Sequence, residues 1–302
     1  PAMRQRPFLQ VDVFTALPYR GNPLAVVLDG EGLTAEAMQQ FTNWTNLSEA
    51  TFVLPPTPEG RAAGADYRVR IFSPGRELPF AGHPTLGSCH AWLQSGGQPR
   101  VAGRVVQECG VGLVALRQDD DRLAFAAPPL IKSGPLDEAD VARIAQGLGV
   151  ARSDILHHAW CDNGPNWRGV MLRSAAQVLA LKPDGAILAG LDVGVVGPTA
   201  EGGASAPRGK VGVVGSSDAD GIAFDVRAFF PGNNGLAEDP VTGSLNAALA
   251  QWLIGAGLAP ARYVASQGTA LGRAGRVHVE QDGADIWVGG HTVTCISGTV
   301  RL

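Results

Sequence analysis

A histidine and an aspartate take equivalent places in an internal repeat of the chain. FAGHPTLGS at residues 80–88 matches LAEDPVTGS at residues 236–244, which aligns His83 with Asp239. Each is followed by a proline, and we expect that proline to open a helix because its missing N–H would have no partner there. His83 and Asp239 are therefore predicted at the N-caps of two helices, where an imidazole and a carboxylate could move protons or orient a substrate.

The repeat also includes the strand before each helix. VRIFSPG at residues 69–75 matches VRAFFPG at residues 226–232, and apolar residues at helical spacing follow both prolines. A duplicated strand, turn and helix indicates two related lobes. The N–H groups at the start of the two helices carry partial positive charge, so we expect them to bind the carboxylate of a small substrate. Ser244 lies in the second of these segments, where its hydroxyl can hydrogen-bond locally.

Glu49 is a candidate acid and base. It lies in NLSEATF, at the junction of a predicted helix and strand, near Leu47, Phe52 and Trp44. An apolar environment favours the neutral carboxyl and allows proton exchange near neutrality. From the residues alone, a solvated glutamate at a strand edge remains the alternative. Asn22, in YRGNPLAVV, is either a turn residue or an amide that lines the site.

The remaining chain is mostly strand and turn. Amphipathic spacing predicts two further helices, over residues 35–44 after an N-cap at Thr34 and over residues 138–147. The pattern indicates the α+β class, with helices packed in curved, largely antiparallel sheets. Residues 198–209, PTAEGGASAPRG, are predicted to be flexible.

Composition excludes several classes of protein. The 302 residues carry 24 basic and 28 acidic side chains, a net charge of −4, and no basic cluster for nucleic acid. The four cysteines are far apart, which predicts neither a zinc site nor a disulfide framework and favours a reducing compartment. Motifs of zinc proteases, serine hydrolases and dinucleotide-binding proteins are missing. No apolar run approaches the roughly 20 residues that span a bilayer. We expect a cytoplasmic protein with no metal, nucleic-acid or membrane partner.

Five motifs together resemble the PhzF-like isomerases of phenazine biosynthesis, which have the diaminopimelate epimerase-like fold. They are VDVFTALPYRGNPLAVV, NLSEATF, FSPGRELPFAGHPTLG, EDPVTGS and SQGTALGRAGRVHV, in this order. The resemblance covers nearly the whole chain and implies two pseudo-symmetric lobes, each a curved sheet around a central helix, with the active site between them. We predict an N-terminal lobe over residues 4–128, a C-terminal lobe over residues 129–290, and a final strand, residues 291–302, that returns to the N-terminal lobe. The resemblance also implies a homodimer and a reaction without a cofactor.

The resemblance assigns roles to residues where the motifs match. Glu49 matches the proton-shuttling glutamate of the family. His83, Asp239 and Ser244 match residues that surround the substrate and assist its proton transfers. The residues expected to contact the substrate are Asn22, Gly82, Pro84, Thr85, Gly243, Asn163 and Gly164.

The reaction implied is an isomerisation of a small carboxylate-bearing metabolite. Related epimerases use a cysteine on each lobe, but here Cys89 lies six residues beyond His83 and no cysteine is near Asp239. We therefore expect Glu49 to take a proton from one carbon and return it to another, which moves a double bond. An amino-acid epimerase or racemase and a non-catalytic small-molecule-binding protein are the alternatives. The family usually has Thr-Gly where this chain has Asn163-Gly164, which leaves the substrate open.

Overall fold

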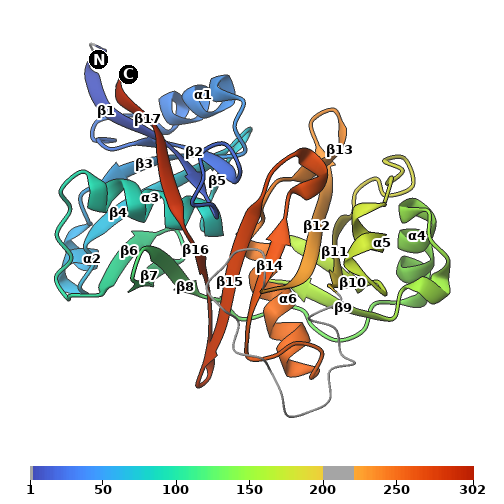
Figure 1. Ribbon diagram of the computed structural model, residues 1–302. Coiled ribbons are helices and arrows are strands. Elements are labelled where there is room, and N and C mark those ends of the chain that lie inside the picture. Colours follow the sequence, from blue (N-terminus) through green and yellow to red (C-terminus); the bar gives the residue numbers. More distant parts are fainter. Residues whose placement is uncertain (1–2, 200–220) are drawn as a thin grey trace. The chain divides into compact units, whose positions relative to one another are not determined.

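The computed structural model describes residues 3–199 and 221–302. The chain divides into two compact units, shown in Figure 1. The first unit comprises Pro1–Ala126 together with Gly289–Leu302, and the second comprises Ala127–Val288. Each unit has its own buried apolar core.

The first unit is a mainly antiparallel sheet with one long helix packed against it. Its elements are β1 (Gln5–Val13), β2 (Asn22–Val27), α1 (Ala35–Thr45), β3 (Ala50–Leu54), α2 (Pro58–Ala62), β4 (Tyr67–Ser73), β5 (Arg76–Leu78), α3 (Gly82–Gln94), β6 (Arg104–Cys109), β7 (Gly112–Asp119), β8 (Arg122–Ala126) and β17 (Thr292–Arg301). The strands lie in the order β17-β1-β2-β3-β4-β6-β7-β8, with β5 beside β4. The β2–β3 and β4–β6 pairs are parallel and the others antiparallel. Strands β1 and β17, from opposite ends of the chain, run side by side (Figure 1).

Helix α3 is the central helix of the first unit and contacts β1, β2, β3, β6 and β8. Its Leu86 and Cys89 are fully buried, and a leucine side chain removed from water contributes about 1.5–3 kcal/mol to stability. Gly87 approaches the sheet so closely that a β-carbon there would lie 2.6 Å from Cδ2 of Leu24. A larger residue at position 87 would displace the helix, and with it His83 in its first turn.

The second unit has the same kind of architecture. Its elements are α4 (Glu138–Leu148), a 3-10 turn (Arg152–Asp154), β9 (His157–Asp162), β10 (Asn166–Met171), α5 (Ala175–Leu179), β11 (Asp192–Pro198), β12 (Ile222–Gly232), β13 (Gly235–Asp239), α6 (Gly243–Gly255), β14 (Arg262–Gln267), a second 3-10 turn (Thr269–Leu271), β15 (Gly275–Asp282) and β16 (Asp285–Gly290). Helix α6 contacts β9 and β15. It also packs closely on β11, where a β-carbon at Gly194 would overlap the side chain of Leu245.

The pattern of strand pairing confirms the internal repeat. In the second unit β9–β10 is antiparallel, β10–β11 parallel, β11–β12 and β12–β13 antiparallel, β12–β14 parallel and β14–β15 antiparallel. The same succession links β1–β2, β2–β3, β3–β4, β4–β5, β4–β6 and β6–β7 in the first unit. The matching segments 69–75 and 226–232 begin on the equivalent strands β4 and β12. The α+β class, with mostly antiparallel sheets around a central helix, is therefore confirmed.

Two predicted helices are confirmed almost to the residue. Helix α1 covers Ala35–Thr45, and the Oγ1 of its N-cap Thr34 accepts a hydrogen bond from the N–H of Ala37. Helix α4 covers Glu138–Leu148. In both, the apolar face predicted from the spacing is buried.

The predicted N-caps of the two central helices are wrong. The N-cap of α3 is Ala81, so His83 is the second helical residue, because a proline fits anywhere in a first turn whose N–H groups have no intrahelical partner. The N-cap of α6 is Thr242, and Asp239 is instead the last residue of β13. Helix α6 starts three residues after Pro240, and the Oε1 of Gln267 accepts the N–H of its N-cap, Thr242.

In the described ranges, no helix is both long and apolar enough to cross a membrane. Most of the segment predicted to be flexible, residues 200–209, lies outside those ranges.

Candidate functional site

A tight turn between α1 and β3 fixes Glu49. Helix α1 ends at Asn46, which has a left-handed backbone with φ of 58°. The Oγ1 of Thr45 accepts the N–H of Leu47, two residues before Glu49. Strand β3 then begins at Ala50, parallel to β2 and antiparallel to β4. Glu49 therefore lies at the entry of a strand that is held on both sides.

The predicted surroundings of Glu49 are apolar in part. Phe52 is fully buried in the core of the first unit, and Leu47 packs against that core. Trp44 is 77% exposed, and its ring lies 6.4 Å from that of Phe41, which packs against Phe52. It lies in the last turn of α1, two residues before the left-handed Asn46 that redirects the chain.

Asn22, Glu49 and His83 come together in the first unit. The Nε2 of His83 lies 3.5 Å from the Oε2 of Glu49, and the two side chains are only 6% and 17% exposed. The Nδ1 of His83 lies 3.4 Å from the Nδ2 of Asn22, the first residue of β2, which is fully buried. The parallel strands β2 and β3 start at the same edge, and α3 begins beside them, so the topology brings the three residues to one place.

Burial keeps the imidazole of His83 uncharged. Desolvation lowers the pKa of His83 to about 3, although the backbone carbonyl of Pro23 accepts a hydrogen bond from the ring and acts in the opposite direction. At neutral pH the contact between His83 and Glu49 is therefore one between a carboxyl group and a neutral imidazole, not an ion pair. A neutral partner does not oppose protonation of Glu49 as a cation would, so the carboxyl can both accept and return a proton.

The low pKa of His83 predicts a loss of stability in acid. Between pH 6.5 and about 3 the unfolded chain binds a proton at this position and the folded chain does not. Stability therefore rises with pH in this window, by about 1.4 kcal/mol per pH unit. For His83→Asn, we expect the difference in free energy of unfolding between about pH 7 and about pH 5 to be smaller than in the wild type by about 2 kcal/mol. Urea titrations at the two pH values measure it; His157→Asn, at an exposed position, is the control, and an unchanged difference in His83→Asn would contradict burial of the neutral ring.

In the second unit, Asp239 is held by the first residues of α6. It ends β13, where it pairs with Ala228 of β12. The hydroxyl of Thr242, the N-cap of α6, donates a hydrogen bond to the Oδ2 of Asp239 at 2.6 Å. This bond orients the carboxyl group of Asp239, with Oδ2 as a hydrogen-bond acceptor.

Ser244 is oriented by two side chains of the β9–β10 hairpin. The Nε1 of Trp167 donates to the Oγ of Ser244 at 3.1 Å, and the Nδ2 of Asn163 donates to its backbone carbonyl at 2.9 Å. The indole N–H can only donate, so the Oγ of Ser244 accepts and its own hydrogen can point to another acceptor. Gly164 forms the exposed turn of the hairpin with φ of 133°, and its N–H donates to Asp162. The structure thus joins the predicted residues Asn163 and Ser244 directly.

Trp167 should support activity through Ser244. Trp167→Phe keeps most of the buried ring and removes the N–H donor, and we expect kcat/KM to fall about three- to tenfold, the cost of one hydrogen bond. Steady-state kinetics measures the effect. Trp160→Phe in β9 is the matched control, because Trp160 is similarly buried in the core of the second unit and should retain wild-type kinetics. Equal losses in the two variants would assign Trp167 a packing role only.

The first residue of each central helix is a buried glycine. Gly82 is the first residue of α3 and Gly243 the first of α6, and N–H groups at these positions have no intrahelical partner. The other two predicted contacts are less suited to an anion. Pro84 has no N–H, and fully buried Thr85 donates its N–H to Ala81 and accepts the Nε2 of a glutamine at its hydroxyl.

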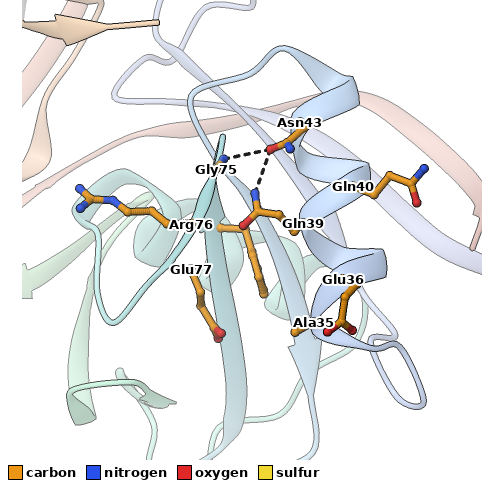
Figure 2. A pocket seen from close by; sticks show the side chains of 9 residues that line it. Ala35, Glu36, Gln39, Gln40, Asn43, Gly75, Arg76 and Glu77 are labelled. Carbon is orange, nitrogen blue, oxygen red and sulfur yellow. Dashed lines mark hydrogen bonds between the residues drawn. The ribbon is translucent and has the colours of Figure 1, made fainter.

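An open groove of about 600 Å³ lies between α1 and the β4–β5 turn of the first unit. Figure 2 shows its polar lining, in which Asn43 Oδ1 accepts from both Gln39 Nε2 and the N–H of Gly75. The predicted site residues are not among those that line it. The groove is open to solvent, so it is a surface feature of the first unit.

Within the described ranges, no cluster of three histidine, cysteine or acidic side chains could hold a metal ion. Two cysteines are buried thiols: desolvation raises the pKa of Cys89 and that of Cys161 to about 12. Neither thiol ionises near neutral pH, so neither is suited to remove a proton from carbon.

Comparisons with known proteins agree with this architecture. The family model of the phenazine biosynthesis-like proteins, PhzC-PhzF, matches residues 11–298. Antisense-enhancing sequence 1 of Schizosaccharomyces pombe is 34% identical over 98% of this chain and 99% of its own length. The trans-2,3-dihydro-3-hydroxyanthranilate isomerase of Pseudomonas aeruginosa is 36% identical over 59% of this chain and 61% of its own.

Two solved structures confirm the predicted fold. A phenazine biosynthesis protein of the PhzF family from Enterococcus faecalis superposes with a TM-score of 0.74 at 24% identity, covering 99% of this chain and 100% of its own. A hydroxyproline epimerase from Agrobacterium vitis superposes with a TM-score of 0.56 at 12% identity, covering 99% and 93%. At these identities the likeness extends to the fold alone.

Proposed function

Because this chain belongs to the phenazine biosynthesis-like (PhzC-PhzF) family and is an isomerase like its named relatives, we propose that it moves a proton and a double bond within a small carboxylate-bearing metabolite, without a cofactor. The observation that carries this proposal is the contact between Glu49 and the buried, neutral His83. It supplies one carboxyl group in a state suited to both accept and donate a proton.

Glu49 acts first as base and then as acid. Its carboxylate takes a proton from an acidic C–H bond, and the bonding electrons enter a new carbon–carbon double bond. The electrons of the original double bond shift to a remote carbon, which takes the same proton back from the carboxylic acid of Glu49. The substrate is thus isomerised with no net gain or loss of atoms or electrons.

The other residues bind and orient the substrate. The N–H groups of Gly82 and Gly243 favour the substrate carboxylate, since helix starts carry partial positive charge. Asp239 accepts a hydrogen bond from a hydroxyl or ammonium group of the substrate, and the hydroxyl of Ser244 donates one. Donors that face charge developing in the transition state lower its energy without rearranging.

The state of the cysteines supports an isomerase over a cysteine-based epimerase. Inversion at one carbon needs a second base on the opposite face of the substrate. Burial raises the pKa values of Cys89 and Cys161 to about 12, so neither thiol is suited to be that base. A non-catalytic binding protein would need neither Glu49 nor a neutral His83 beside it.

The proposed substrate class follows from the groups that bind the carboxylate and from the proton transfer by Glu49. One relative is named for acting on trans-2,3-dihydro-3-hydroxyanthranilate, and we take a cyclic or acyclic carboxylate with an acidic C–H and a conjugated double bond as the class for this chain. We further propose a homodimer, which light scattering would test.

A substrate panel in deuterium oxide tests the proposed function. The panel contains small cyclic and acyclic unsaturated carboxylates, including a dihydro-hydroxyanthranilate, and proton NMR follows each compound. Migration of a double bond in at least one compound is the expected result. Binding of panel compounds without migration or exchange would favour the binding-protein alternative.

A further inference from the structure

A chain of hydrogen bonds leads from the core of the second unit to Asp239. The Nε2 of Gln267, the last residue of β14, donates to the Oγ1 of Thr242 at 2.9 Å. The same Oγ1 donates its hydrogen to the Oδ2 of Asp239 at 2.6 Å. A threonine hydroxyl has one hydrogen, so accepting from Gln267 commits that hydrogen to the carboxylate.

The orientation of the Gln267 amide is fixed by its other partners. Its Oε1 accepts the N–H of Thr242 at 3.0 Å and the Nδ2 of Asn246 at 2.8 Å. Its Nε2 also donates to the backbone carbonyl of Asp239 at 3.1 Å. All four bonds agree with one assignment of oxygen and nitrogen, and a flipped amide would place like groups together at three of them, the N–H of Thr242, the Nδ2 of Asn246 and the carbonyl of Asp239.

These groups are shielded from water. Gln267 and Asn246 are each 1% exposed, and Thr242 is 6% exposed. If one of these hydrogen bonds is lost, water is poorly placed to replace it. A buried polar group without a hydrogen bond lowers the stability of the folded protein. The network holds both the backbone and the side chain of Asp239.

The first unit also contains a glutamine bonded to a threonine, Gln107 and Thr85. The Nε2 of Gln107, in β6, donates to the Oγ1 of Thr85 at 3.0 Å, and its Oε1 accepts the hydroxyl of Tyr67. Strands β6 and β14 are equivalent in the repeat. Each unit therefore has a buried glutamine bonded to a threonine near a helix start, at positions that do not align in the repeat, and only in the second unit is Asp239 bonded to that threonine.

We propose that Gln267 and Thr242 are positioning residues that hold the Asp239 carboxylate in a single rotamer, with its hydrogen-bond acceptor directed to the substrate. The proposal rests on the proposed function, in which Asp239 contacts the substrate. Neither Gln267 nor Thr242 touches the reacting atoms, and both act through Asp239.

The test separates the hydroxyl from the shape of the side chain. Thr242→Val is nearly isosteric and removes the donor to Asp239, whereas Thr242→Ser retains it. Gln267→Leu removes the group that directs the hydroxyl. Gln107→Leu is the matched control, because it removes an equally buried glutamine from the equivalent strand of the first unit.

The first readout needs no substrate. Three-bond NMR couplings of Asp239 report whether its χ1 angle is fixed or averaged. We expect a single rotamer in the wild type, Thr242→Ser and Gln107→Leu, and averaging in Thr242→Val and Gln267→Leu. A single fixed rotamer in Thr242→Val would overturn the proposal, whether or not a substrate has been found.

The second readout is kinetic. We expect Thr242→Val to lower kcat about tenfold with KM changed less than about twofold. A misplaced Asp239 loses more of its stabilisation of the transition state than of its contribution to substrate affinity. Thr242→Ser should restore most of kcat. Equal losses in Thr242→Val and Thr242→Ser, or a wild-type kcat in Thr242→Val, would overturn the proposal. Absence of activity in the wild type would instead contradict the proposed function and leave the coupling measurement to decide this one.

Discussion

Replacing Glu49 by glutamine is expected to abolish isomerisation, with kcat at least about 1,000-fold lower, because an amide cannot carry the proton between the two carbons. The change is isosteric and keeps a polar group 3.5 Å from the Nε2 of His83. Backbone contacts at the end of α1 and the start of β3 position residue 49. A change of its side chain leaves these contacts in place, so the fold should persist. Steady-state assays on the identified substrate, with circular dichroism as a check on folding, measure the effect.

Glu36→Gln is the matched control for this prediction. Glu36 lies in the first turn of α1 and lines the exposed groove, which none of the predicted site residues line. It should leave kcat and KM at the wild-type values. A loss of less than about tenfold in Glu49→Gln would contradict the role of Glu49, because general acid and base catalysis contributes more than that.

Replacing Asp239 by asparagine is expected to lower kcat about 100-fold, the second largest effect. The variant keeps the shape of the side chain and loses the negative charge that receives the Thr242 hydroxyl. It also puts an NH2 donor where one of two acceptor oxygens stood, so a substrate hydroxyl or ammonium loses its partner. Kinetics with the same substrate measures the change in kcat and KM.

The neighbouring Glu238 provides the control for Asp239. Its two carboxylate oxygens receive the guanidinium of Arg227 at 2.9 and 2.8 Å, and both side chains are buried. Glu238→Gln should lower the free energy of unfolding, because it leaves the buried Arg227 without its charge partner, but it should not lower kcat of the folded enzyme. If Glu238→Gln lowered kcat as far as Asp239→Asn, the loss would reflect disturbance of β13 and not the chemistry of Asp239.

The parts of the fold that depend on local pattern could be predicted. Thr34 followed by amphipathic spacing defines α1, and the repeated strand and turn motifs at residues 69–75 and 226–232 define equivalent strands. The meeting of Glu49 with His83 could be anticipated only from the family resemblance, since these residues are far apart in sequence.

The features that the sequence did not predict depend on the tertiary structure. The N–H of Thr242, the N-cap of α6, is bonded to Gln267, 25 residues further along the chain, and no local motif shows this. Trp44 is exposed because it lies outside the face of α1 that is buried, which is formed by Met38, Phe41 and Thr42. The repeat does not point to Gln267, because Gln107 pairs with Tyr67 in β4 whereas Gln267 pairs with Val226 in β12, two residues further along the equivalent strand.

The most direct test of the central claim is the position of deuterium in the product. The identified substrate is converted by the wild-type enzyme in deuterium oxide, and NMR locates the label. If Glu49 carries one proton between two carbons, at least part of the product retains the original proton at the remote carbon, and the configuration of any returned substrate is unchanged. Deuterium at the original carbon with inverted configuration would contradict the account and identify a two-base epimerase.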